Sequence, residues 1–417
     1  MYKEFELILS PSQAFNNDEL KKILSGKAGV DDSRIDAVRI LNRSVDARQR
    51  TIKVNVKAGL YVDEEAPKRD VFSIPVRNVS DSIPVIIVGS GPAGLFAALH
   101  LIGKNIKPII LERGKDVGER KKDVARISTE HIVDPESNYC FGEGGAGTFS
   151  DGKLYSRSKK RGDIKQVFEW FYHFGSDESV LYESHPHIGT DRLPGVIRTM
   201  REFILQCGGE FRFNSKVTDL IIEGDRVRGV TCGNERIMSE AVILATGHSA
   251  RDIYELLEKK NICIEPKDFA VGVRIEHPQA LIDSIRYHSK IKDRWLPAAS
   301  YSLAEQVNGR GVYSFCMCPG GFIVPSATAP DEIVVNGMSP SARNSPYANS
   351  AIVAEVKAAD LVKYKNSGAL KGLLFQRDME TNAYRMSGSG QKAPAQRLVD
   401  FLNHKSGSSL PRSSYFP

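Results

Sequence analysis

A glycine-rich turn is the first group of residues with the types and spacing to do chemistry. Residues 85–88 read as a buried parallel strand, and Gly89, Gly91 and Gly94 follow at the spacing of a dinucleotide-binding fingerprint. The first glycine makes a tight turn, the second lets backbone N–H groups approach a pyrophosphate, and the third lets the next helix pack closely. The helix expected over 92–103 points its positive N-terminus at the phosphates. The predicted contacts are Gly89, Gly91, Pro92, Ala93 and Gly94.

An acidic residue follows at the place where a ribose would be held. Residues 107–111 predict a second parallel strand, and Glu112 comes directly after it. A carboxylate at that strand end accepts hydrogen bonds from ribose hydroxyls. We therefore expect Glu112, together with its neighbour Arg113, to bind the cofactor.

A second strand end also favours a dinucleotide. An apolar run ends in Ala245, Thr246 and Gly247, whose small side chains let the backbone pass close to a bound ligand. The strands expected at 217–222 and 226–232 form a β-meander before it, and Val217 is a predicted cofactor contact. One fingerprint, a meander and a later Ala-Thr-Gly together indicate FAD. A second nicotinamide fingerprint is absent, so NAD(P)H would act only as a transient electron donor.

The glycine-rich loop over residues 142–153 is a further cofactor candidate. Close approach of backbone to a pyrophosphate or flavin edge needs glycine, and a lysine in the loop can meet negative charge. A flexible surface loop would have the same composition, and we favour the flavin role. The predicted contacts are Gly145, Gly147, Thr148, Ser150 and Lys153.

Three side chains are candidates for acid–base chemistry and substrate binding. His248 and His277 each follow a strand expected to end near the cofactor, and histidine can donate a proton as a flavin passes a hydride. A structural role is the alternative for both. Arg274 either holds an anionic substrate or pairs with a carboxylate such as Glu276.

Cys316 and Cys318 are candidates for a redox role. On a strand they face the same side, and they can form a disulfide only if the backbone bends. A relay to flavin and a pair of buried structural thiols are both open. The six cysteines form no CxxC pair, which fits reduced thiols, and no metal site is expected.

Composition limits the class of protein. The 417 residues suggest two or three domains, and no apolar run approaches the ~18 residues of a membrane span. No signal peptide is recognised, so we expect a cytoplasmic protein. The net charge of +6 is mild, and the basic clusters at 120–122 and 159–161 read as solvated loops. Nucleic acid is therefore not an expected partner, and the patterns specify no oligomeric state.

The periodicity predicts an α/β fold with extra modules. Strands near 5–9, 35–41 and 52–56 and a helix after Asn17 resemble part of a ferredoxin-like module. Helices are expected near 162–174, 194–207 and 345–365. The predicted division is a ferredoxin-like module at 1–75 with a linker at 63–70, a Rossmann-like FAD-binding domain at 82–265, an α+β substrate or cap domain with a return segment at 266–400, and a loop-like end at 401–417.

Several longer motifs carry a resemblance to a known family. The chain is similar to flavoproteins of the glutathione-reductase superfamily, and within it to a bacterial family of uncharacterised FAD-dependent dehydrogenases. That resemblance implies FAD, a parallel sheet and a β-meander. Relatives close the flavin domain with a C-terminal acidic segment, and no such segment is recognised after residue 340. The motifs span residues 142–153, 247–252, 273–278, 315–321 and 336–339.

The expected function is therefore an FAD-dependent oxidoreductase that transfers hydride through flavin N5. Its partner would be a small-molecule substrate or a redox partner, and the protein would supply positioning and electrostatics. Two alternatives stay open. One is a flavoprotein that modifies RNA, suggested by the small N-terminal module and the basic balance. The other is a non-catalytic flavin-binding sensor or scaffold.

Overall fold

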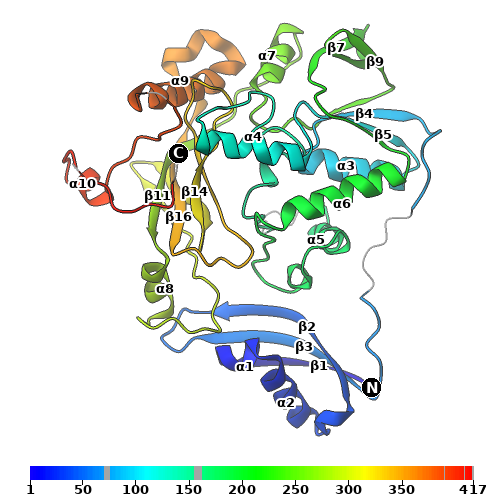
Figure 1. The fold of residues 1–417 in the computed structure, drawn as a ribbon, viewed down its shortest axis with the longest axis vertical. Coiled ribbons are helices and arrows are strands. Elements are labelled where there is room, and N and C mark those ends of the chain that lie inside the picture. Colours follow the sequence, from blue (N-terminus) through cyan, green and yellow to red (C-terminus); the bar gives the residue numbers. More distant parts are fainter. Residues whose placement is uncertain (70–75, 155–161, 389, 408, 416–417) are drawn as a thin grey trace.

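An N-terminal antiparallel sheet forms the first part of the structure. The computed structural model describes residues 1–69, 76–154, 162–388, 390–407 and 409–415. The sheet has the order β1-β3-β2, with two short helices packed on it (Figure 1). Ser10 and Asn16 cap these helices with their side chains. The elements are β1 (Tyr2–Leu9), α1 (Pro11–Phe15), α2 (Asn17–Ala28), β2 (Ile35–Asp46) and β3 (Lys53–Val62).

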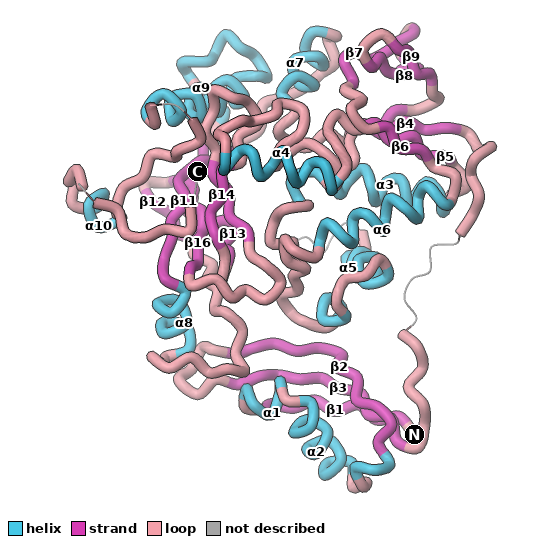
Figure 2. Tube along the Cα trace, viewed as in Figure 1, coloured by secondary structure: helices cyan, strands magenta, loops and turns pink. Residues whose placement is uncertain are grey.

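A four-stranded parallel sheet of order β10-β4-β5-β6 follows. On one face, Ile87 and Ile110 pack against the helices, of which α3 and α6 lie side by side (Figure 2). The elements are β4 (Pro84–Val88), α3 (Pro92–Gly103), β5 (Lys107–Leu111), α4 (Val117–Thr129), α5 (Ile164–His173), α6 (Leu193–Gln206), β6 (Glu210–Arg212) and β10 (Val242–Leu244).

The opposite face of the parallel sheet is covered by the β-meander. Because side chains alternate along a strand, Ile86 and Ile109 point away from the helices and pack against Leu220 and Val230. The sheet is thus buried on both faces, which explains its continuous apolar strands. The elements here are β7 (Val217–Glu223), β8 (Arg226–Cys232), β9 (Glu235–Met238) and α7 (Arg251–Lys259).

The remaining part of the chain is rich in antiparallel strands. A sheet of order β11-β16-β13-β12 lies beside the two-stranded ribbon β14-β15. The elements are β11 (Phe269–Pro278), α8 (Gln279–Tyr287), β12 (Ala304–Val307), β13 (Arg310–Cys318), β14 (Phe322–Pro325), β15 (Val335–Met338), β16 (Tyr347–Val356), α9 (Lys371–Met386) and α10 (Leu398–Leu402). In the described part of the chain, each helix is too short or too polar to cross a bilayer.

The helix expected over 345–365 is wrong. Its first half is β16, a central strand that pairs with β11 on one side and β13 on the other. Ile352, Val353 and Val356 have the spacing of a helix stripe, but β-branched residues also suit a strand, and pairing on two sides decides the outcome. The chain turns into short 3₁₀ segments only after this strand, at Ala358–Asp360 and Val362–Leu370.

The basic cluster at 120–122 is also not a solvated loop. It lies on α4, where Arg120 is fully buried while Lys121 and Lys122 are exposed. Residues 159–161 and the end of the predicted linker, at residue 70, lie outside the described residues. The first 69 residues contact the rest of the chain through Arg43, whose Nε donates to Glu183 Oε1 at 2.8 Å.

The close contact of α3 with β4 generates a stability prediction. A Cβ on Gly94 would lie 2.0 Å from the Gly89 carbonyl oxygen, so Gly94→Ala must push the helix from the strand. We expect a loss of about 1–3 kcal/mol in the free energy of unfolding, measured by urea titration of the apoprotein. Gly103→Ala on the same helix meets nothing within 4 Å and should leave stability unchanged or slightly raised. Equal stability of the two variants would contradict the proposed packing.

Candidate functional site

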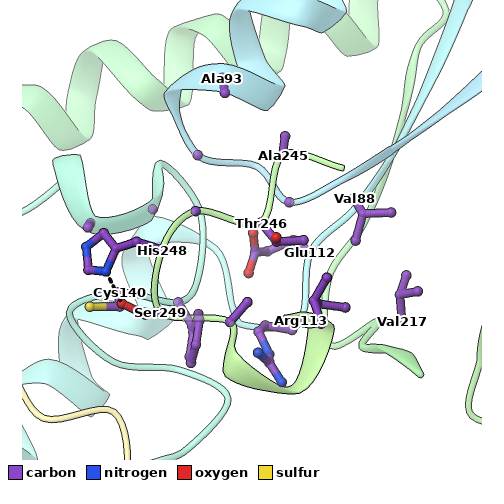
Figure 3. A pocket seen from close by; sticks show the side chains of 18 of the residues that line it. Val88, Ala93, Glu112, Arg113, Cys140, Val217, Ala245, Thr246, His248 and Ser249 are labelled. Atoms are coloured by element: carbon purple, nitrogen blue, oxygen red, sulfur yellow. Dashed lines mark hydrogen bonds between the residues drawn. The ribbon is translucent and has the colours of Figure 1, made fainter. Parts of the chain in front are cut away.

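A cavity of about 280 Å³ lies at the carboxyl ends of the parallel strands. It sits where the chain leaves β4 between β5 on one side and β10 on the other, the position at which open α/β sheets bind ligands. Figure 3 shows side chains that line it. They come from the turn after β4, the end of β5, residues 140–147, the start of β7 and residues 245–253.

The glycine turn forms one wall of this cavity. Gly89 has φ +103°, and a Cβ there would lie 2.6 Å from the Ala245 carbonyl oxygen. Gly91 is the N-cap of α3 with an ordinary φ of −67°, and no side chain caps this helix. Among the described residues, the first N–H groups of α3 thus have no side-chain partner, and a helix N-terminus of this kind suits an anionic group such as a phosphate.

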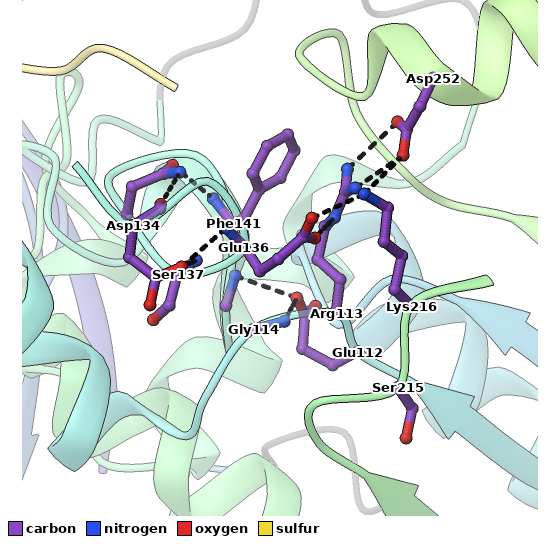
Figure 4. A network of polar contacts seen from close by, with 12 residues as sticks. Glu112, Arg113, Gly114, Asp134, Glu136, Ser137, Phe141, Ser215, Lys216 and Asp252 are labelled. Atoms are coloured by element: carbon purple, nitrogen blue, oxygen red, sulfur yellow. Dashed lines mark hydrogen bonds and ion pairs between the residues drawn. The ribbon is translucent and has the colours of Figure 1, made fainter. Parts of the chain in front are cut away.

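Glu112 lies against the cavity but is also engaged by the protein itself. Its Oε2 accepts hydrogen bonds from the Ser90 N–H at 2.9 Å and the Ser90 hydroxyl at 2.7 Å. Its Oε1 accepts from the N–H groups of Gly114 at 2.9 Å and Gly142 at 3.0 Å (Figure 4). A carboxylate offers about four acceptor positions, so this side chain ties three backbone segments together. Its contact with a ribose stays a prediction.

A network of four charges closes the cavity beside Glu112. Arg113 donates to Glu136 at 2.7 Å and to Asp252 at 2.6 Å, and Lys216 contacts the same carboxylates at 2.6 and 3.5 Å (Figure 4). Burial alone would lower the pKa of Arg113, but the two carboxylates outweigh it and raise the pKa. The Arg113 guanidinium also lies 4.3 Å from the centre of the Phe141 ring.

Much of the glycine-rich loop is buried, and its backbone wraps around Arg120. The buried guanidinium donates to the carbonyl oxygens of Asn138 at 2.8 Å, Glu143 at 2.6 Å and Gly145 at 2.8 Å. Burial lowers the pKa of Arg120 to about 10, which leaves the side chain charged at neutral pH. The loop is therefore held in one conformation by an internal cation.

The structure brings most of the predicted cofactor residues together, but not all. Four predicted contacts do not line the cavity. Gly94 packs α3 on β4, the Thr148 hydroxyl donates to the Glu143 carbonyl, and the Ser150 hydroxyl donates to the Gly147 carbonyl. Lys153 points to two cysteines. The predicted residues that line it are Gly89, Gly91, Pro92, Ala93, Glu112, Arg113, Gly145, Gly147, Val217, Ala245, Thr246 and Gly247.

Sequence reasoning missed several lining residues. Lys216 directly precedes the predicted contact Val217, and Asp252 lies in the first turn of α7, so their neighbours in sequence offered a signal. Cys140 and Phe141 offered none, because they lie in a stretch read only as loop. Burial raises the pKa of the Cys140 thiol, which keeps it neutral beside the cavity.

The catalytic candidates lie in two places. His248 lines the cavity, and its Nδ1 lies 3.1 Å from the Ser249 hydroxyl (Figure 3). His277 does not line the cavity; its Nε2 lies 2.8 Å from the Tyr301 hydroxyl, and burial lowers its pKa.

Arg274 lies with the cysteines and away from Glu276. Its Nη1 donates to Asn349 Oδ1 at 2.6 Å and to the Cys316 carbonyl at 3.3 Å. The expected alternative, an ion pair with Glu276, is not formed, because Glu276 instead accepts hydrogen bonds from Ser414. Cys316 and Cys318 also lie outside the cavity lining.

The four donors on Glu112 generate a prediction. Glu112→Gln leaves one oxygen for two pairs of donors and turns an NH₂ group toward buried N–H groups. We expect the apoprotein to lose about 1–3 kcal/mol in free energy of unfolding, measured by urea titration. Glu119→Gln, at an exposed position nearby, is the control and should stay within about 0.5 kcal/mol. Unchanged stability of Glu112→Gln would show that these hydrogen bonds do not hold the loops.

Comparison with known proteins gives partial matches for two regions. Residues 268–417 match the family described as FAD-dependent protein, C-terminal domain-like, and residues 1–61 match a domain of unknown function. The first match supports FAD as the cofactor and confirms the prediction from the fingerprint. The mixed α/β fold with a parallel sheet agrees with this assignment.

Individual relatives extend the comparison. Protein FixC of Escherichia coli is 25% identical over 210 residues, which cover 49% of this chain and 45% of FixC. The crystal structure of Thermovibrio ammonificans THI4 covers 45% of this chain and 67% of its own, with 18% identity and a TM-score of 0.30.

A longer match decides the family. An uncharacterised protein of Clostridium beijerinckii is 38% identical over 408 residues, which cover 94% of this chain and 76% of the relative. The chain therefore belongs to the same family as this clostridial protein, and its C-terminal part carries the domain of FAD-dependent proteins.

Proposed function

We propose that the protein is an FAD-dependent dehydrogenase or reductase with a flavin fold of the glutathione-reductase type. The cavity at the end of the parallel sheet would hold FAD. The partner would be a small-molecule substrate or a redox partner. We keep the division into an N-terminal module at 1–75, a flavin domain at 82–265 and a substrate domain at 266–400 as part of this proposal.

The position of Gly91 is the observation that supports this proposal most directly. Its φ of −67° is open to any residue, and a Cβ there would meet only the Gly145 Cα, at an ordinary 3.7 Å. The protein's own backbone thus gives no reason for a glycine. Gly91 lines the cavity at the N-terminus of α3, where a ligand passing against the backbone would need the missing side chain.

Charge in the cavity supports an anionic dinucleotide. The N-terminus of α3 adds a partial positive charge, and no side chain caps it among the described residues. The cations Arg113 and Lys216 are balanced by Glu136 and Asp252, so this end of the cavity is polar without a net charge. Such a surface suits ribose hydroxyls and a purine edge better than a second phosphate.

The chain's own residues offer one route for protons. When bound, FAD supplies two-electron chemistry, and the protein supplies position and proton transfer. His248 is the titratable imidazole on the cavity wall, and its contact with the Ser249 hydroxyl orients the ring. We propose that His248 holds a proton for the reaction, with Ser249 as a positioning residue.

The Gly91 position gives a test of cofactor binding. Gly91→Ala fills space at the cavity without a clash, so the apoprotein should keep its stability while FAD affinity falls by roughly tenfold or more. Affinity is measured by titrating apoprotein with FAD and following flavin fluorescence. Gly103→Ala on the same helix is the control and should bind FAD normally. Normal FAD binding by Gly91→Ala would contradict this placement of the cofactor.

Turnover separates an enzyme from a sensor. The flavin-loaded protein should pass electrons from a reductant, such as NADPH or a member of a metabolite panel, to a dye acceptor over many cycles. His248→Gln should slow this turnover while FAD stays bound, because the amide cannot carry the proton. Flavin that is reduced only once, with no turnover for any donor, would favour a sensor or scaffold.

A further inference from the structure

The strand that carries Cys316 and Cys318 is bent between the two thiols. In a regular strand, Cα atoms two residues apart are separated by about 6.6 Å, near the upper limit of about 6.8 Å for a disulfide. Along β13, four residues from Phe315 to Cys318 lie opposite only three on β16, from Ala351 to Asn349, which is a β-bulge. Cys316 has φ +49°, so the backbone bend lies at the first cysteine itself. The backbone bend that a disulfide between Cys316 and Cys318 would need is therefore present.

A lysine from the glycine-rich loop lies over both sulfurs. Lys153 Nζ lies 3.8 Å from Cys316 Sγ and 3.4 Å from Cys318 Sγ. Its third neighbour is Asp151 Oδ2, at 2.7 Å. An ammonium group has three donors, and here they face one carboxylate and two sulfurs. Two structural thiols in an apolar core would have no such cation.

The surroundings of the thiol pair carry a net positive charge. Asp151 is already shared with Arg343, whose Nη2 lies 3.0 Å away. Arg274 lies against the Cys316 carbonyl at 3.3 Å, and within the described residues no carboxylate pairs with it. The charged and titratable groups around the pair are Lys153, Arg274, Arg343, Asp151 and His187, the last of which forms a β-bridge with Lys153.

The two cysteines differ in exposure and in acidity. Cys316 is partly exposed, whereas Cys318 is fully buried. A hydrogen bond from Cys318, followed by the charges of Lys153 and Arg274, outweighs burial and lowers the pKa of Cys316 well below its ordinary value. The same hydrogen bond and burial raise the pKa of Cys318. A partly exposed thiol with a lowered pKa beside a buried thiol with a raised pKa is the arrangement of a reactive dithiol.

We propose that Cys316 and Cys318 form a thiol–disulfide exchange site for an anionic disulfide. The Cys316 sulfur attacks one sulfur of the disulfide, forms a mixed disulfide and releases the other half as a thiolate. The Cys318 thiol gives its proton to that thiolate, attacks Cys316 Sγ and releases the second half as a thiolate. The protein dithiol loses two electrons and becomes a disulfide, and the disulfide substrate gains them and becomes one thiol and one thiolate.

This site does not depend on the proposed flavin function. Lys153 and Arg274 would attract the negative charge of the disulfide and stabilise the thiolate that attacks it. Cys263 is an exposed cysteine elsewhere in the chain and serves as an internal comparison. An assay on the reduced full-length protein with no electron donor added therefore tests the thiol pair alone.

The experiment follows release of the coloured thiolate from the anionic disulfide 5,5′-dithiobis(2-nitrobenzoate). The unaltered protein should show a fast phase that releases two thiolates per chain, and Cys263→Ser should keep this phase. Cys318→Ser should release one and keep the other half as a mixed disulfide on Cys316. Cys316→Ser should lose the phase, and Lys153→Gln should slow it by roughly tenfold. The cationic disulfide cystamine should react more slowly than the anionic one with the unaltered protein.

Two further measurements hold even if a variant fails to fold. In the unaltered chain, peptide mass spectrometry after the reaction should find a disulfide between Cys316 and Cys318. Alkylation of Cys316 by iodoacetamide should follow a pH profile with its midpoint below that of Cys263, since only a thiolate reacts. A fast phase that survives in Cys316→Ser, or a Cys316 that reacts no faster than Cys263 near neutral pH, would overturn the proposal. Recovery of both cysteines without a shared disulfide would also overturn it.

Discussion

The carboxylate of Glu112 fixes the backbone segments on which the cavity depends. Its two oxygens accept from the turn after β4, from Gly114 after β5 and from Gly142 in the glycine-rich loop. Removing a carboxylate from water costs several kcal/mol, and four hydrogen bonds offset that cost. Because three segments are bonded to the same two atoms, none of them can shift without breaking a buried hydrogen bond. The wall of the cavity is therefore supported by hydrogen bonds within the protein itself.

A second buried charge extends this arrangement along the loop. Arg120 is surrounded by carbonyl oxygens of residues 138–145, and the nearby negative charge of Glu112 opposes the fall in its pKa caused by burial. Glu143, in the same loop, pairs with Arg201 of α6 at 3.2 Å. A glycine-rich segment has little tendency to adopt one conformation by itself. In this loop, which has few side chains to pack, the buried charges of Arg120 and Glu143 favour one backbone conformation.

Local patterns predicted the elements around the fingerprint well, because the information lies within a few residues. The bounds of α3 and β5 agree with the glycine spacing and with the apolar run before Glu112. The wrong predictions concern residues whose structure depends on contacts with distant parts of the chain. Residues 347–356 have a helical stripe of apolar residues but become a strand between β11 and β13. The burial of Arg120 depends on a loop about twenty residues later, and nothing in the sequence next to Arg120 signals it.

The residues of the candidate site also divide into those that local spacing predicts and those whose contacts depend on distant parts of the chain. Nine of the twelve predicted cofactor contacts that line the cavity follow strands that end at one sheet edge, a feature that spacing alone can reveal. Asp252 and Lys216 have sequence neighbours that pointed to the cavity, but their ion pairs with Arg113 and Glu136 form only in the folded chain. Lys153 was expected at the cofactor, since a lysine in a glycine-rich loop suits a phosphate. Its direction was set instead by Asp151 and by the bulge in β13.

The glycine-rich loop therefore connects two chemically different places. Gly145 and Gly147 line the cavity, while Asp151 and Lys153, a few residues later, lie at the thiol pair. Arg120 and Glu112 bond the loop only as far as Thr148. Lys153 is held by an ion pair with Asp151 and by a bridge to His187. The cavity wall and the cation over the two sulfurs therefore lie on one continuous loop but are held by different contacts.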